Sequence, residues 1–173
     1  MNFNLDKSIL ILERTPVVLE QLLSGLPDDW TKNNEGGDTW SPYDVLGHLI
    51  HGERTDWMAR LKIILNGSHE TFPVFNRTAM FEESKGKSLG DLLTEFKSVR
   101  AENLKTLRSL GLTEKDFDRT GIHPKFGEVK LRQLLSTWTI HDLTHIAQIA
   151  RVMAKQYKQE IGPWLEYMRL VQG

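Results

Sequence analysis

The segment 130–157, KLRQLLSTWTIHDLTHIAQIARVMAKQY, predicts the longest and most apolar helix of the chain. Apolar residues recur along it at helical spacing and form a stripe, and most of the remaining surface is apolar as well. A helix that is apolar nearly all round belongs in the interior of a helical bundle. The stripe consists of Leu131, Leu134, Leu135, Trp138, Ile149 and Val152, and His141 and His145 fall on the same stripe.

Three further segments show the helical spacing of apolar residues. They cover 5–23, 41–65 and 88–110, and Pro16 should kink or divide the first of them. The second and third segments begin with Ser-x-x-Asp, a typical N-terminal cap. These segments, together with 130–157, predict four main helices.

The connections between these helices are long, and no segment alternates convincingly with the period of a strand. Residues 28–39 and 119–128 are expected to form loops or turns, and 68–87 a long connection with a short turn at 78–83. A short helix should close the chain at 164–171. We therefore predict an all-α, four-helix bundle in a single domain over 1–173, with a short C-terminal helix.

The composition excludes several classes of protein. The chain has 173 residues, 39% of them hydrophobic and 26% charged, as in an ordinary globular protein. Its net charge of −1 gives no basic surplus for nucleic acid. No apolar run is long enough for a membrane span, and the first residues lack the form of a signal peptide, so we expect a cytoplasmic protein. The absence of cysteine excludes disulfides and thiolate metal sites.

His141 and His145 are four residues apart, so their side chains differ by only about 40° around the helix and lie one turn apart. A single histidine on an apolar stripe is usually a core residue with one hydrogen bond. Two of them on the most buried helix must each satisfy two ring nitrogens, and a metal ion would satisfy one nitrogen of each ring. The third ligand should come from the second helix, where His48 and His51 are both candidates, the more apolar surroundings favouring His48.

Asp142 lies between the two histidines, and His-Asp-x-x-His is one methylene short of the metalloprotease pattern His-Glu-x-x-His. The surrounding sequence has no protease-like features, so we interpret Asp142 as a group that orients a neighbour. His69 and His123 fall in predicted loops, where we expect them to be exposed to solvent or to stabilise turns.

Several short motifs follow one another along the chain, none of them specific alone. They are Trp40-Ser41-Pro42, His48-Leu49, His123-Pro124-x-x-Gly127, Leu131-x-x-Leu134-Leu135 and His141-Asp142-x-x-His145-x-x-Gln148-Ile149. Their order and spacing resemble the DinB-like superfamily, which includes YfiT-type metal-dependent hydrolases and thiol-dependent S-transferases. The resemblance covers the chain from Trp40 to about Trp164.

The resemblance implies a four-helix bundle, often dimeric, with a divalent metal site made of three histidines. Matched by position, these are His48, His141 and His145, and His51 becomes a residue that supports a ligand or lines the pocket. One divalent ion is the implied cofactor. Zinc and nickel are the favoured ions, although imidazole sites accept several metals.

The implied activity is that of a metal-dependent enzyme acting on a small molecule, either a hydrolase or an S-transferase that uses a low-molecular-weight thiol. The candidate catalytic helpers are Asp142, Gln148, His51 and Glu53. Two other interpretations stay open. One is a metal-binding protein without catalysis that acts in stress or partner binding, and the other is a metal-free bundle with structural histidines.

Overall fold

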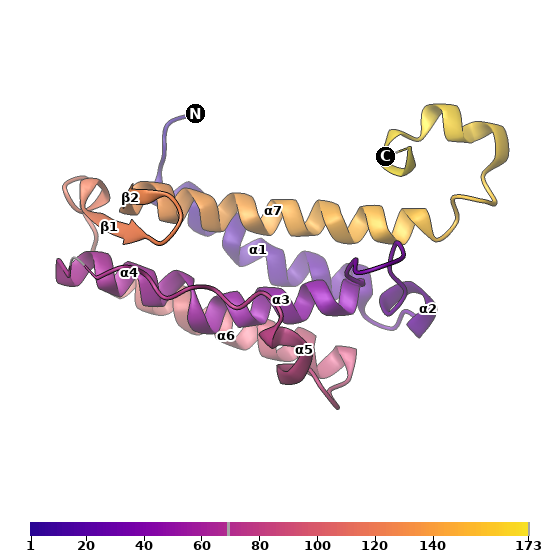
Figure 1. Cartoon of the computed structure of the whole chain (residues 1–173), viewed down its shortest axis with the longest axis horizontal. Coiled ribbons are helices and arrows are strands. Elements are labelled where there is room, and N and C mark those ends of the chain that lie inside the picture. Colours follow the sequence, from indigo (N-terminus) through magenta and orange to yellow (C-terminus); the bar gives the residue numbers. More distant parts are fainter. Residues whose placement is uncertain (69, 173) are drawn as a thin grey trace.

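The computed structural model describes residues 1–68 and 70–172, and its long helices run side by side (Figure 1). Helix α7 packs against α1, α3 and α4, while α6 packs against α1 and α3. This arrangement confirms the predicted four-helix bundle. The bundle helices are α1 (Leu5–Leu23), α3 (Pro42–Thr55) with its continuation α4 (Trp57–Asn66), α6 (Leu89–Ser109) and α7 (Leu131–Lys155).

The predicted second helix is in fact two helices that meet at Asp56. Helix α3 begins with the expected capping box, in which Ser41 and Asp44 bond each other's backbone N–H groups. It ends at Asp56, whose backbone angles of φ −113° and ψ −73° are distorted from those of a regular helix. The Asp56 carboxylate then lies 2.6 Å from Nε of Arg60 at the start of α4, where a helix N-terminus favours negative charge.

Pro16 does not divide α1, which runs unbroken from Leu5 to Leu23. A proline has no N–H, so the carbonyl of Leu12, four residues earlier, loses its helical hydrogen bond. Arg100 of α6 donates a hydrogen bond of 2.7 Å from Nη1 to this carbonyl. A side chain from a neighbouring helix therefore replaces the bond that the proline removes.

A small hairpin precedes α7, although no strand was predicted. Its strands β1 (Thr120–His123) and β2 (Gly127–Lys130) are antiparallel, with Gly121 opposite Val129. Four residues per strand are too few for an alternating pattern to stand out in the sequence. The backbone of Gly127 has φ 72°, a left-handed conformation that glycine adopts readily.

The connections contain short helical turns. Helix α2 (Asp28–Thr31) lies in the predicted loop, and α5 (Ala79–Glu83) matches the turn predicted at 78–83. The C-terminal segment forms the 3₁₀ turns η2 (Gly162–Tyr167) and η3 (Arg169–Val171) instead of one α-helix, and another such turn is η1 (Asp116–Asp118). Within the described residues, no helix combines the length and apolar character required to cross a membrane.

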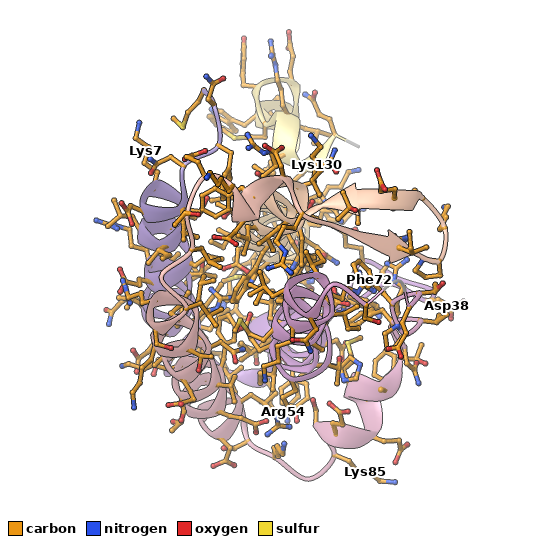
Figure 2. All side chains as sticks on the ribbon, turned by 90° about the vertical axis from the view of Figure 1, so that its left-hand side faces the viewer. Lys7, Asp38, Arg54, Phe72, Lys85 and Lys130 are labelled. Atoms are coloured by element: carbon orange, nitrogen blue, oxygen red, sulfur yellow. The ribbon has the colours of Figure 1, made fainter. Side chains whose placement is uncertain are left out.

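Side chains fill the space between the helices, as the view along the bundle shows (Figure 2). Apolar clusters occupy most of this interior, one of them built around Trp57 and Trp138, whose rings stack at 5.8 Å. The interior also holds a charged group. Arg100, 1% exposed, bonds both oxygens of Asp142 at 2.6 and 3.0 Å and one oxygen of Glu53 at 2.9 Å.

Candidate metal centre

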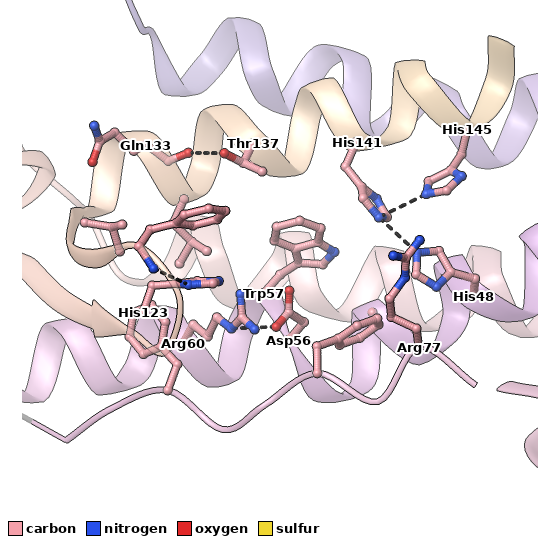
Figure 3. Close-up of a pocket in the computed structure, with 16 residues that line it drawn as sticks. His48, Asp56, Trp57, Arg60, Arg77, His123, Gln133, Thr137, His141 and His145 are labelled. Atoms are coloured by element: carbon pink, nitrogen blue, oxygen red, sulfur yellow. Dashed lines mark hydrogen bonds and ion pairs between the residues drawn. The ribbon is translucent and has the colours of Figure 1, made fainter. Parts of the chain in front are cut away.

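Three imidazole rings meet between α3 and α7 (Figure 3). Nε2 of His141 lies 3.1 Å from Nε2 of His48 and 3.1 Å from Nε2 of His145. Two of the rings come from successive turns of α7, and the third crosses from the helix that packs against it. Helix packing therefore brings together one donor atom from each ring, and these atoms lie within 4.8 Å of one another.

Aromatic rings enclose the cluster and keep water from its inner side. The ring of Trp40 lies 4.8 Å from that of His48, and the ring of Trp57 lies 5.1 Å from that of His141. Phe75 adds an edge contact to His48 at 5.4 Å. His48 is only 4% exposed as a result.

Burial holds the three histidines in their neutral form. It lowers the pKa of both His48 and His141 to about 3, and the neighbouring imidazoles lower these pKa values further in the same direction. Burial also lowers the pKa of His145, although its hydrogen bond to Gln148 acts in the opposite sense. All three rings are thus neutral near pH 7, which is the form that binds metal ions.

The donor set fits a divalent ion of the zinc class. Nitrogen ligands at 2.0–2.1 Å in tetrahedral geometry are about 3.3 Å apart, close to the two separations of 3.1 Å from His141. Three nitrogen atoms facing one another cannot all be satisfied by sharing protons among themselves. Within the described residues, no carboxylate joins the cluster, so three imidazoles would leave coordination positions open for water or substrate.

The Nδ1 atoms of the three histidines, which face away from the cluster, differ in their hydrogen bonds. Nδ1 of His145 lies 2.8 Å from Oε1 of Gln148, which fixes the ring proton on Nδ1 and leaves Nε2 free to bind an ion. The Nδ1 atoms of His48 and His141 are buried and have no hydrogen-bond partner among the residues described. Of the three histidines, therefore, only His145 has a side-chain acceptor at Nδ1 that would orient the ring for metal binding through Nε2.

The remaining predicted site residues lie elsewhere. Nδ1 of His51 points at the carboxylate of Glu83 on α5, 3.0 Å from each oxygen, so His48 is the α3 histidine that meets the pair. Asp142 and Glu53 bind Arg100 in the interior and do not line the pocket. His69 lies outside the described residues.

A pocket of about 380 Å³ opens beside the cluster. Besides the cluster itself, its polar groups are the Asp56–Arg60 ion pair and the side chains of Arg77, His123, Gln133 and Thr137. Most of the other walls are apolar. They include Trp57, Phe72, Phe75, Phe126, Val129 and Leu134.

Two of these polar residues were not recognised in the sequence as parts of a site. His123 was expected to be exposed or to stabilise a turn. It does accept hydrogen bonds from the turn N–H groups of Lys125 and Phe126, but it also ends β1 and lines the pocket. Arg77 lies in the long connection before α5, and its guanidinium sits 5.6 Å from the ring centre of Trp40. A motif, His-Pro-x-x-Gly, marked the first of them, whereas no local pattern could show where the connection carrying Arg77 would pack.

A second, more polar hollow of about 250 Å³ shares His145, Gln148 and Arg77 with the site. Glu35 and Arg151 line it and form an ion pair of 2.7 Å. The histidine cluster is therefore open to two compartments, one mainly apolar and one polar.

Comparisons with known proteins agree with this architecture. The solved structure of YfiT from Bacillus subtilis, described as a probable metal-dependent hydrolase with an unusual four-helix bundle topology, superposes with a TM-score of 0.74. The two chains are 23% identical, and the match covers 91% of this chain and 87% of the other. No curated protein matched the sequence. The family pattern of the DinB superfamily matches residues 11–149, most of the chain, and the protein therefore belongs to the DinB superfamily.

Proposed function

We propose that this protein is a metal-dependent enzyme that holds one divalent ion on His48, His141 and His145 and acts on a small, largely apolar molecule. The observation that carries the proposal is the convergence of three neutral imidazoles at the side of a 380 Å³ pocket. A divalent ion on three neutral ligands lowers the pKa of a bound water or thiol and polarises a carbonyl. Zinc and nickel are the ions we favour.

The residues of the chain would bind and orient the substrate. Trp57 and the phenylalanines of the pocket take its apolar part and exclude water. Arg77 forms no ion pair among the described residues, so its charge is available to an anionic group in either of the two hollows that it lines. Gln148 holds the ring of His145 in one orientation.

Hydrolysis is the reaction we favour, and YfiT, the protein of similar fold, is described as a probable hydrolase. In hydrolysis a water oxygen bonds to the electrophilic carbon, and the leaving group departs with the electron pair and takes up a proton. The polar hollow beside His145 favours a second reaction, transfer to a low-molecular-weight thiol, because it offers space for a second molecule. The chain has no cysteine, so this thiol would have to be a separate substrate.

We further propose a homodimer. Leu10 of α1 and Ile140 and Leu143 of α7 are exposed and lie around one apolar groove on the bundle surface. Exposed apolar patches of this kind are typical of protein interfaces. Light scattering on the purified chain should give twice the monomer mass, and Leu143→Glu should shift it toward the monomer.

Elemental analysis of untagged protein tests the metal site. We expect about one divalent ion per chain, as for a single three-ligand site. His48→Ala, His141→Ala and His145→Ala should each remove most of the ion. His51→Ala is the matched control, because it removes a buried histidine of the same helix that binds Glu83 instead. Retention after His48→Ala with loss after His51→Ala would show that the wrong histidine has been assigned.

Activity assays separate the proposed reactions from simple metal binding. The metal-loaded protein should hydrolyse members of an ester and amide panel, or consume an electrophile only when a small thiol is added. Both activities should disappear after chelation and return with the metal. A protein that binds metal at the three histidines and shows neither activity would instead be a non-catalytic metal-binding protein.

A further inference from the structure

His123 stands at the far end of the pocket from the three histidines (Figure 3). Its position follows from the hairpin, since it is the last residue of β1 and pairs with Gly127 across the turn. Two aromatic side chains pack against its ring. Phe126 stacks on it at 4.5 Å, and Phe72 meets it edge-on at 6.3 Å.

The hairpin turn determines which nitrogen of His123 carries the proton. The backbone N–H groups of Lys125 and Phe126 both donate to Nδ1, at 3.1 and 3.2 Å. An atom that accepts two hydrogen bonds cannot carry a proton, so the proton of the neutral ring must lie on Nε2. Partial burial and the nearby charges of Arg60 and Lys125 lower the pKa of His123 and favour the same neutral form.

Nε2–H of His123 is therefore a donor that a bound molecule can use. No described residue accepts a hydrogen bond from it, and most of the nearby pocket wall is apolar. The Arg60 guanidinium is another donor in the pocket lining, but Asp56 already balances its charge. The apolar walls around His123 would make the desolvation of an anion costly, so a neutral acceptor suits this end best.

We infer that His123 selects substrates by donating a hydrogen bond from Nε2 to a neutral acceptor, such as a carbonyl or ether oxygen. The substrate class is then an elongated molecule with an apolar or aromatic body, a reacting group at the three histidines and an acceptor at its opposite end. This inference rests on the proposed function, because it takes the histidine cluster as the place where the substrate reacts.

A pair of metal-binding probes tests the selection directly. The full chain, loaded with one equivalent of Zn²⁺, is titrated calorimetrically with 4-acetylbenzohydroxamic acid and with 4-isopropylbenzohydroxamic acid. The two probes have similar shapes, and only the first carries an acceptor at the end away from the metal-binding group. We expect the wild type to prefer the acetyl probe roughly three- to tenfold, the effect of one neutral hydrogen bond.

His123→Asn is the informative variant, because the asparagine side-chain oxygen can take the place of Nδ1 in the turn while the Nε2 donor is lost. The preference for the acetyl probe should disappear in it. Thr137→Val is the matched control. It removes another polar group of the pocket lining, but one whose hydroxyl already donates to the carbonyl of Gln133 at 2.7 Å, so the preference should remain.

A second measurement does not depend on metal. Long-range ¹H–¹⁵N spectra of the metal-free protein should show His123 with an unprotonated Nδ1 and a protonated Nε2 near pH 7. A proton on Nδ1 would overturn the inference, as would equal binding of the two probes or a preference that survives His123→Asn. If neither probe binds the Zn²⁺-loaded wild type while zinc is retained, the proposed function fails and the inference fails with it.

Discussion

At the scale of single residues, the three imidazoles of the cluster are chemically alike but differ in their surroundings. His48 and His141 have strongly lowered pKa values and no acceptor for Nδ1 within the described part of the chain. His145 has Gln148 behind it. Metal affinity and pH response should therefore depend on different members of the cluster.

Gln148→Leu should weaken metal binding about 10- to 100-fold, the usual effect of removing a hydrogen-bond acceptor behind a histidine ligand. The ring of His145 would lose the contact that fixes its proton and its orientation. Competition with a chelator of known affinity measures the change. Gln148→Glu keeps an acceptor and should retain most of the affinity, and an unchanged affinity in Gln148→Leu would contradict this role.

The stability of the metal-free protein should fall in mild acid. In the folded chain the pKa values of His48 and His141 are about 3, whereas in the unfolded chain they return to about 6.5. Between these values the unfolded chain binds more protons, so the stabilisation is complete above about pH 6.5 and is lost as pH falls toward 3. Denaturant unfolding measured from pH 7 to pH 5 tests this.

His48→Gln removes one of these titrating groups. The loss of unfolding free energy between pH 6.5 and 5 should then be smaller by roughly 2 kcal/mol, since each shifted histidine contributes up to about 1.4 kcal/mol per pH unit. An identical pH dependence in wild type and variant would show that His48 titrates normally in the folded protein.

At the scale of helices, Arg100 connects most of the bundle. From α6 it donates to the carbonyl of Leu12 in α1, to Glu53 in α3 and to Asp142 in α7. Glu53 also accepts a hydrogen bond of 2.8 Å from the indole of Trp138. Asp142 directly follows His141 in the chain, so the buried ion pairs of Arg100 fix the position of α7 at the histidine cluster.

Arg100→Leu should destabilise the fold by about 3–5 kcal/mol, because the buried carboxylate of Asp142 and the free carbonyl of Leu12 lose their partner and the buried carboxylate of Glu53 loses its counter-charge. Arg108→Leu is the matched control on the same helix. Its ion pair with Glu13 is half exposed, so we expect a loss below about 1 kcal/mol. Thermal or denaturant unfolding compares the two, and equal losses would mean that the buried group adds no more than a surface pair.

At the scale of the whole molecule, the histidine cluster joins α3 to α7, two segments about ninety residues apart in the chain. An ion bound by both helices stabilises only the folded protein. When the free ion concentration is a thousand times its Kd, the free energy of unfolding rises by about 4 kcal/mol. For a chain of this length, that gain raises Tm on the order of 10 °C.

Calorimetric scans with and without added Zn²⁺ measure this shift. His48→Ala removes the only α3 member of the cluster, so the shift should largely disappear, while His51→Ala should retain it. A shift that persists in His48→Ala would place the stabilising ion elsewhere on the protein.

Much of the bundle could be predicted from the sequence because helices depend on local patterns. The capping boxes at Ser41 and Ser88 mark two of the helix starts correctly. Pro16 did not divide its helix, one of the two effects expected of it, and the residue that compensates for it lies 84 positions away in α6. The hairpin at 120–130 was missed because strands of four residues are too short to show an alternating pattern.

The sequence by itself determined that His141 and His145 share one face of a helix, since that relation depends only on the 3.6-residue period. The residues around His48 and the family resemblance favoured it over His51, but only packing shows which of these two α3 residues meets α7. The tertiary structure also shows that Asp142 and Glu53 bind Arg100 and do not line the pocket. His123 and Arg77, in contrast, lie in the pocket wall. These placements depend on contacts between distant segments, which no local pattern encodes.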